Sequence, residues 1–160
     1  MNNALLIDQA LLARVSAEAK VSPRQRKNLN FHGSDTDSAH RLLNAIEPES
    51  YLAPHRHLDP RKDETMIVLC GRMGIVLFDE AGKVTQTHVL EAGSPVCGIT
   101  IPHGLFHTLV SLQSGSVMFE SKAGPYVPLE ADERAPWASA EGCDGVGAYA
   151  VTLRKLFGQT

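Results

Sequence analysis

The sequence predicts an all-β domain, a β-sandwich or barrel, with a short helix at its N-terminus. The first observation is a change of hydrophobic period at Arg24, where a helical pattern gives way to alternation with a period of two. The second is a series of short apolar stretches that extends to about Lys122. The third is the interruption of these stretches, about every 8–12 residues, by turn-forming groups such as Asp59-Pro60 and Pro102-His103-Gly104. Together they are typical of a chain of short antiparallel strands.

The N-terminal segment predicts one helix. Asp8 has a side chain suited to an N-cap, and apolar residues recur with helical spacing from Leu11 to Val15. Ser22-Pro23 ends the helix, because proline cannot donate a hydrogen bond to the preceding turn.

The segment after Pro23 predicts a strand with one polar face. Alternation places on that face the side chains of Arg24, Arg26, Asn28, Asn30 and His32. Residues 38–46 could form a helix or a strand, and a strand-like segment is favoured there. Further strands are expected at Ser50–Ala53, Glu64–Cys70, Gly74–Phe78, Val84–Leu90, Gly98–Ile101, His107–Ser111 and Ser116–Lys122, and Tyr149–Phe157 is expected to be a strand or a helix.

Length and composition favour one domain. A chain of 160 residues with 43% hydrophobic and 21% charged residues can bury a core of its own. We divide it into an N-terminal helical segment (1–22), a β-barrel (23–130) and a C-terminal extension that packs on the barrel (131–160).

Charge and hydropathy exclude several kinds of partner. The net charge of −3 with no basic block argues against nucleic-acid binding. No apolar run approaches the 18 or so residues of a membrane span, and the N-terminus does not resemble a signal peptide. The three cysteines, Cys70, Cys97 and Cys143, show no paired spacing, so we expect reduced thiols and a cytoplasmic protein.

Four side chains predict a metal site. His55 and His57, two residues apart on a strand, point to the same side, and a hairpin turn can fold Glu64 back toward them. His107 arrives from another strand after the turn at Gly104. Three imidazoles and one carboxylate suit a divalent ion such as Zn, Fe, Mn or Ni. The alternative for each histidine is a surface or hydrogen-bonded role, and it is the combination that favours a metal.

These residues resemble the two motifs of the cupin superfamily. The first motif is matched by His55, His57, Glu64 and Gly71, and the second by Pro102, Gly104 and His107. The resemblance implies a double-stranded β-helix, or jelly-roll barrel, around one metal ion. Six residues, 58–63, separate His57 from Glu64, which is a longer loop than the usual cupin spacing.

A closer resemblance, over about Leu6 to Gly142, is to the WbuC family of cupin-fold metalloproteins. It implies a β-barrel with a metal site and a link to bacterial surface-polysaccharide metabolism, but no assigned reaction. It rests on several short matches: Pro23-Arg24-x-Arg26, Asn30-Phe31-His32, Arg41-Leu42-Leu43-Asn44, Glu47-Pro48-x-Ser50-Tyr51, Pro54-His55-Arg56-His57, Phe78-Asp79-x-x-Gly82, Ser111-Leu112-x-x-Gly115-Ser116 and Gly124-Pro125-Tyr126.

Other polar residues are candidates for substrate contacts. Arg24 and Arg26 offer guanidinium groups that suit an anion, and solvated charges on an edge strand are the alternative. Tyr51 lies on the ligand face by strand parity and is a candidate donor beside the metal ligands.

Candidate catalytic residues follow near the end of the barrel. Glu120 and Lys122 alternate along a late strand, and Tyr126 follows Gly124-Pro125. A carboxylate, an amine and a phenol near a metal suit acid–base chemistry. A structural ion pair between Glu120 and Lys122 is the alternative.

Three functions remain open. The first is a metal-dependent, isomerase-like enzyme that polarises a carbonyl of a sugar or sugar phosphate. The second is a non-heme iron dioxygenase, and the third is a non-catalytic binding or sensor protein. We expect a small-molecule substrate, for instance an anionic sugar, and a homodimer that covers strand edges.

Overall fold

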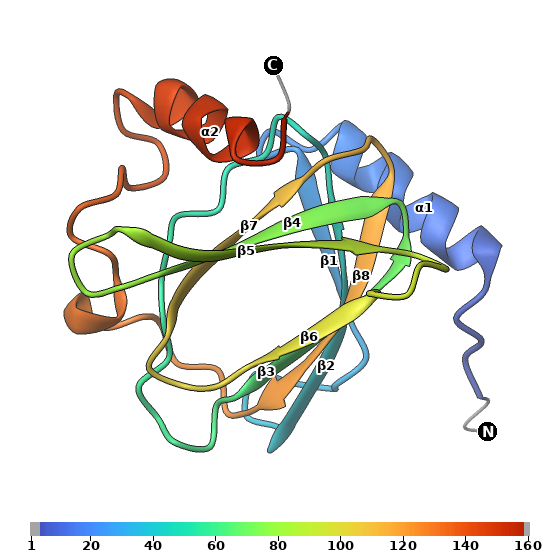
Figure 1. Cartoon of the computed structure of the whole chain (residues 1–160). Coiled ribbons are helices and arrows are strands. Elements are labelled where there is room, and N and C mark those ends of the chain that lie inside the picture. The colour runs from blue at the N-terminus through green and yellow to red at the C-terminus, as the bar shows by residue number, and fades with distance from the viewer. Residues whose placement is uncertain (1–3, 159–160) are drawn as a thin grey trace.

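Two antiparallel sheets face each other in the computed structural model, which describes residues 4–158 (Figure 1). The larger sheet has the strand order β1-β2-β8-β3-β6, and the smaller has the order β5-β4-β7. The strands are β1 (Arg26–Asn30), β2 (Ala39–Ile46), β3 (Glu64–Cys70), β4 (Arg72–Phe78), β5 (Val84–Glu91), β6 (Gly98–Ile101), β7 (Phe106–Ser111) and β8 (Ser116–Ala123). The predicted all-β class with one N-terminal helix is confirmed.

The main core lies between the two sheets. Met66 and Met118 of the larger sheet pack in one cluster with Met73, Ile75 and Leu109 of the smaller one, and all five side chains are buried. This core fills only one end of the space between the sheets. At the other end the inner face of the larger sheet carries polar groups, and antiparallel register places His40 opposite Lys122 and Leu42 opposite Glu120. The fold thus leaves a polar region inside the β-structure.

The N-terminal helix, α1 (Gln9–Lys20), covers the outer face of the larger sheet. Its apolar stripe packs on Leu43, Ala45 and Val117, and Asp8 caps it by accepting a hydrogen bond from the Leu11 N–H at 2.8 Å. The helix continues beyond the apolar residues at Leu11–Val15 to Lys20, and it stops just before Ser22-Pro23 as expected.

One predicted strand is wrong. Residues 50–53 form no strand, because their backbone carbonyls bond to side chains instead of to a neighbouring strand. Arg26 donates to the Tyr51 carbonyl at 2.7 Å, and the Thr108 hydroxyl donates to the Leu52 carbonyl at 2.6 Å. The apolar segment near the C-terminus is helical, as α2 (Val146–Lys155).

The C-terminal region packs on the outer face of the smaller sheet. Ala150 and Leu153 of α2 join Val76, Phe78 and Val110 in a second core cluster. Gly74 on β4 is required there, since a Cβ atom would lie 2.6 Å from the Phe157 ring. No helix within residues 4–158 has the length and apolar character needed to span a membrane.

A buried carboxylate ties the end of β2 to the turn between β7 and β8. Glu47 is 5% exposed and accepts hydrogen bonds from the Ser114 hydroxyl at 2.6 Å and the Gly115 N–H at 2.8 Å.

Replacement Glu47→Ala leaves these donors without their acceptor. We expect the free energy of unfolding to fall by about 1–3 kcal/mol, measured by urea denaturation. Glu49→Ala, at an exposed position, is the control, and equal midpoints for the two variants would contradict the role of Glu47.

Candidate metal centre

The segment between β2 and β3 carries two of the predicted ligands, and β7 holds it in place. The His55 N–H donates to the His107 carbonyl at 3.0 Å, and the His107 N–H donates to the His55 carbonyl at 2.9 Å. This reciprocal pair brings the two imidazole rings to a centroid separation of 4.7 Å. The His57 ring lies 5.4 Å from that of His55. The three rings therefore meet although His55 and His57 do not lie on a regular strand.

The C-terminal region holds the same segment from its other side. The Arg56 N–H donates to the Glu133 carbonyl at 2.9 Å, and the Leu58 N–H donates to the Glu133 carboxylate at 2.8 Å. Burial alone would raise the pKa of Glu133, but the N–H groups of Glu130 and Leu58 outweigh it and lower that pKa. The Arg56 side chain makes its contacts away from the proposed ligands, with Glu80 and over the Phe106 ring. The segment with His55 and His57 is thus fixed on both sides.

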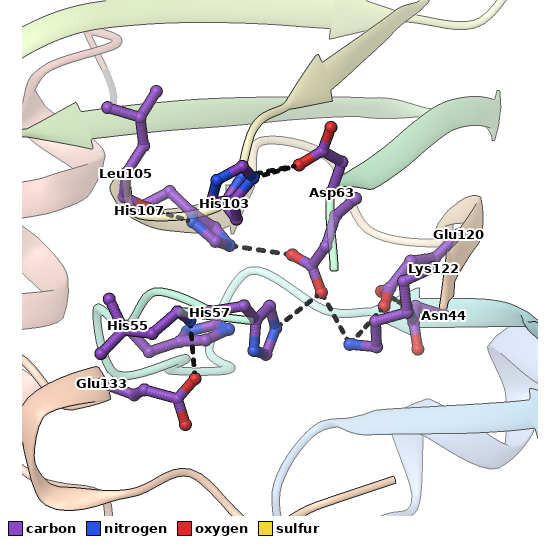
Figure 2. Close-up of polar contacts among 12 residues, drawn as sticks. Asn44, His55, His57, Asp63, His103, Leu105, His107, Glu120, Lys122 and Glu133 are labelled. Atoms are coloured by element: carbon purple, nitrogen blue, oxygen red, sulfur yellow. Dashed lines mark hydrogen bonds and ion pairs between the residues drawn. The ribbon is translucent and has the colours of Figure 1, made fainter. Parts of the chain in front are cut away.

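Glu64 completes the set. Its side chain, at the start of β3, is almost wholly buried, and its Oε1 and Oε2 lie 3.0 Å from Nε2 of His57 and 3.0 Å from Nε2 of His107. Donor atoms of His55, His57 and Glu64 lie within 4.8 Å of one another. The longer loop before Glu64 therefore does not remove the carboxylate from the histidines. In Figure 2 dashed lines from His57, His107 and Lys122 meet at one unlabelled carboxylate, and the contacts of these three residues identify it as that of Glu64.

The hydrogen bonds of the rings leave the right atoms free for a metal ion. Nδ1 of His107 lies 2.9 Å from the Leu105 carbonyl and Nδ1 of His55 lies 3.1 Å from the Ala53 carbonyl, and a carbonyl can only accept. Each Nδ1 therefore donates its proton to a carbonyl, which leaves Nε2 as the ring nitrogen that could bind a metal ion. Nε2 of His107 lies 3.0 Å from a Glu64 oxygen, so a metal ion bound between these two atoms would replace their hydrogen bond. Ligating histidines commonly show this donation to a carbonyl.

The electrostatics of the group also suit a cation. Burial, with a smaller contribution from His107, lowers the pKa of His55 to about 3, so this ring is neutral near pH 7. Burial alone would raise the pKa of Glu64, but hydrogen bonds from His107 and His57 and the charge of Lys122 hold it well below its usual range. A neutral imidazole and an ionised carboxylate are the forms that bind divalent metals.

Lys122 joins Glu64 to a second carboxylate. Its Nζ lies 2.7 Å from Glu64 Oε1 and 2.8 Å from Glu120 Oε1, and Asn44 donates to the other Glu120 oxygen. Burial would lower the pKa of Lys122, but Glu120 and Glu64 together raise it above the usual lysine value. The predicted candidates Glu120 and Lys122 are thus adjacent to the histidines, and they form the ion pair that was the alternative interpretation.

A cavity of about 330 Å³ extends from the histidines across the larger sheet. Arg26, Asn28, Asn30 and His32 line one side of it, so the alternating polar face predicted from the sequence lies in the cavity. A size near 300 Å³ is at the lower end of small-molecule sites.

Sequence reasoning gave no role to His40 and Asn44, which also line this cavity. The His40 ring stacks on His32 with a centroid separation of 4.0 Å, and both rings are buried. The missed signal is the period of two along β2, which places His40, Leu42 and Asn44 on one face.

The remaining predicted residues lie farther from the histidines. Tyr126 lines the cavity but is 59% exposed, at its rim. Arg24 is exposed in the turn before β1 and lines an adjoining groove. Tyr51 is not among the residues that line the cavity: it packs in the second core cluster and its hydroxyl donates to the Ser139 carbonyl at 2.6 Å. Strand parity misplaced it because residues 50–53 are not a strand.

Comparison with known proteins supports the fold. No protein with curated annotation matches the sequence. A conserved protein of unknown function, SPY1581 from Streptococcus pyogenes, has a TM-score of 0.54 and 14% identity, covering 79% of this chain and 93% of that one. KdgF from Halomonas sp. has a TM-score of 0.50 and 18% identity, covering 67% of this chain and 85% of that one.

An oxalate oxidase determined with the substrate analogue glycolate has a TM-score of 0.51 and 18% identity. The match covers 67% of this chain and 55% of the oxidase, so this chain spans about half of that enzyme. The fold is the cupin jelly roll, as predicted. A family model described as a domain of unknown function, DUF6016, matches residues 7–90, more than half of the chain. The chain therefore belongs to the DUF6016 family.

Proposed function

We propose that this protein is a metal-dependent cupin in which His55, His57, Glu64 and His107 hold one divalent ion. We further propose that it acts on a sugar or sugar phosphate in an isomerase-like reaction. The observation that carries the proposal is the approach of three imidazoles to one buried carboxylate at the wall of a polar cavity. The resemblance to the WbuC family supports a role in bacterial surface-polysaccharide metabolism.

A bound divalent ion would polarise a substrate carbonyl. The chain supplies the other groups of the proposed site. Lys122 positions the Glu64 carboxylate, because its Nζ lies 2.7 Å from Glu64 Oε1. Glu120 is a buried carboxylate that lines the cavity without touching any of the four proposed ligands, whereas Asp35, which also lines it, is exposed, so we assign proton transfer to Glu120. Tyr126 at the rim is the group that a substrate meets on entry.

Metal binding is the first test. We expect protein purified without added metal to contain up to one divalent ion per chain, measured by mass spectrometry of the elements. After treatment with a chelator, calorimetric titration with Zn²⁺ should give one site. His55→Ala and His107→Ala should weaken it by more than about 100-fold, because even changes outside the ligand sphere cost 10–100-fold.

His88→Ala is the matched control for this test, since His88 lies on β5 and bonds to Gln86. Its Zn²⁺ affinity should equal that of the wild type. Retention of Zn²⁺ by a His55→Ala/His107→Ala double variant would disprove the site.

The position of Lys122 leads to a prediction on stability. In Lys122→Met the carboxylates of Glu64 and Glu120 lose the cation that they share, so we expect the metal-free protein to lose about 3 kcal/mol of stability. A divalent ion at Glu64 restores the missing charge. Zn²⁺ should therefore raise the melting temperature of Lys122→Met by more than that of the wild type.

Thermal denaturation with and without Zn²⁺ measures both effects. Lys83→Met, at an exposed position, is the control and should behave as the wild type does. A smaller Zn²⁺-induced shift in Lys122→Met than in the wild type would show that Lys122 does not compensate Glu64.

Catalysis is tested on a panel of aldose and ketose phosphates without oxygen, with Zn²⁺ or Mn²⁺. We expect interconversion that falls by about 100-fold or more in Glu120→Gln, the scale of a lost acid–base group. Oxygen uptake that depends on ferrous iron would instead identify a dioxygenase. Ligand binding without turnover over the whole panel would identify a binding protein.

A further inference from the structure

The mouth of the cavity holds an arginine whose ionic partner is exposed. Arg26 lines the cavity, and its side chain is only 12% exposed. Its Nη1 donates to the Tyr51 carbonyl at 2.7 Å and lies 3.5 Å from the Ser50 hydroxyl. Its Nη2 lies 2.7 Å from each carboxylate oxygen of Glu141. The guanidinium therefore already binds a carboxylate, one supplied by the chain itself.

We propose that Arg26 is the binding site for a carboxylate of the ligand, and that Glu141 occupies it until that ligand displaces it. The inference rests on the proposed function, in that it concerns the ligand of the same cavity. Among the sugars of the proposed function it names sugar acids, which are small polyhydroxy carboxylates, rather than sugar phosphates, as the ligand class.

The two halves of the Arg26–Glu141 pair are held very differently. The Tyr51 carbonyl fixes the guanidinium without help from Glu141. Glu141 has a side chain that is 40% exposed, in the exposed stretch 140–145. An ion pair with one partner so exposed contributes little to stability and exchanges readily with ions in solution. The pair can thus open on the Glu141 side while Arg26 keeps its place.

The chain around Glu141 has an anchor of its own. The Tyr51 hydroxyl donates to the Ser139 carbonyl at 2.6 Å, two residues before Glu141. Burial raises the pKa of Tyr51, so this phenol stays protonated as a donor. Loss of the Glu141 contact therefore frees the guanidinium without detaching the segment.

Of the two strong cations that line the cavity, Arg26 is the one available to a ligand's carboxylate. Lys122, the other strong cation among the lining residues, is shared by Glu64 and Glu120, which are both buried. For Arg26, Glu141 is the sole ionic partner among residues 4–158. A guanidinium binds a carboxylate in a planar geometry that an ammonium does not offer. The ligand's carboxylate would replace that of Glu141.

The neighbours of Arg26 indicate the rest of the ligand. Asn28 and Asn30 follow on the same face of β1, and their amides line the cavity. Amides donate to and accept from hydroxyl groups, so this wall suits a chain or ring that carries several hydroxyls. A polyhydroxy acid would bind Arg26 through its carboxylate and Asn28 and Asn30 through its hydroxyl groups.

The test uses metal-free full-length protein, so that binding does not report the metal site. D-gluconate and inorganic phosphate are titrated separately, with binding followed by nuclear magnetic resonance of the arginine Nε–H groups. Gluconate should shift the Arg26 signal. In Glu141→Gln we expect gluconate to bind roughly tenfold more tightly, because an internal competitor has been removed. Glu91→Gln changes the net charge equally at an exposed site on β5 and should bind as the wild type does.

Arg26→Met should abolish gluconate binding, and Arg26→Lys, which keeps the charge but not the fork, should weaken it. Equal gluconate affinity in the wild type and Glu141→Gln would overturn the proposal, as would unchanged binding in Arg26→Lys. Tighter binding of phosphate than of gluconate to Glu141→Gln would overturn the assignment to a carboxylate. Zn²⁺ titration of the same variants is independent, so its failure would disprove the metal centre while the gluconate result stood.

Discussion

The buried carboxylate of Glu64 is the constraint on which the site depends. An ionised carboxylate that is 2% exposed costs several kcal/mol unless positive charge or hydrogen-bond donors surround it. The fold brings His57, His107 and Lys122 to its two oxygens. These groups come from separate parts of the chain, so the charge of Glu64 links β3, β7, β8 and the segment before β3. A metal ion bound at this point would by itself supply positive charge to the buried Glu64 carboxylate.

Backbone contacts position the histidines with little help from regular strands. His55 is held by two hydrogen bonds to His107 on one side and lies against residues 133–135 on the other. The C-terminal region therefore forms part of the frame around the ligands. Its packing on the smaller sheet, through α2 and Phe157, attaches that frame to the rest of the fold.

Local pattern in the sequence predicted the cavity wall where the chain forms a true strand, whereas His55 and His57 meet without strand geometry because backbone hydrogen bonds to His107 and Glu133 hold their segment. The polar face of β1 was found because the true strand alternates, and its inward residues do line the cavity. Tyr51 was misplaced because the same rule was applied to a segment without strand geometry. Asn44 contacts Glu120 because of the register between β2 and β8. Glu133 contacts the segment that carries His55 and His57 because of long-range packing. Spacing along one sequence carries no information on these.

Both charged groups that we assign to ligands already have partners within the chain. Glu64 is paired with Lys122 and two histidines, and Arg26 is paired with Glu141. This protects the protein from the cost of an unpaired charge when the cavity holds no ligand. It also means that each ligand must compete with an internal group, which lowers the affinity of every displacing ligand by the same factor, so that only ligands with enough binding energy of their own remain bound. The internal pairs therefore act as a filter, since only a ligand that satisfies both ends of the cavity recovers the energy of both.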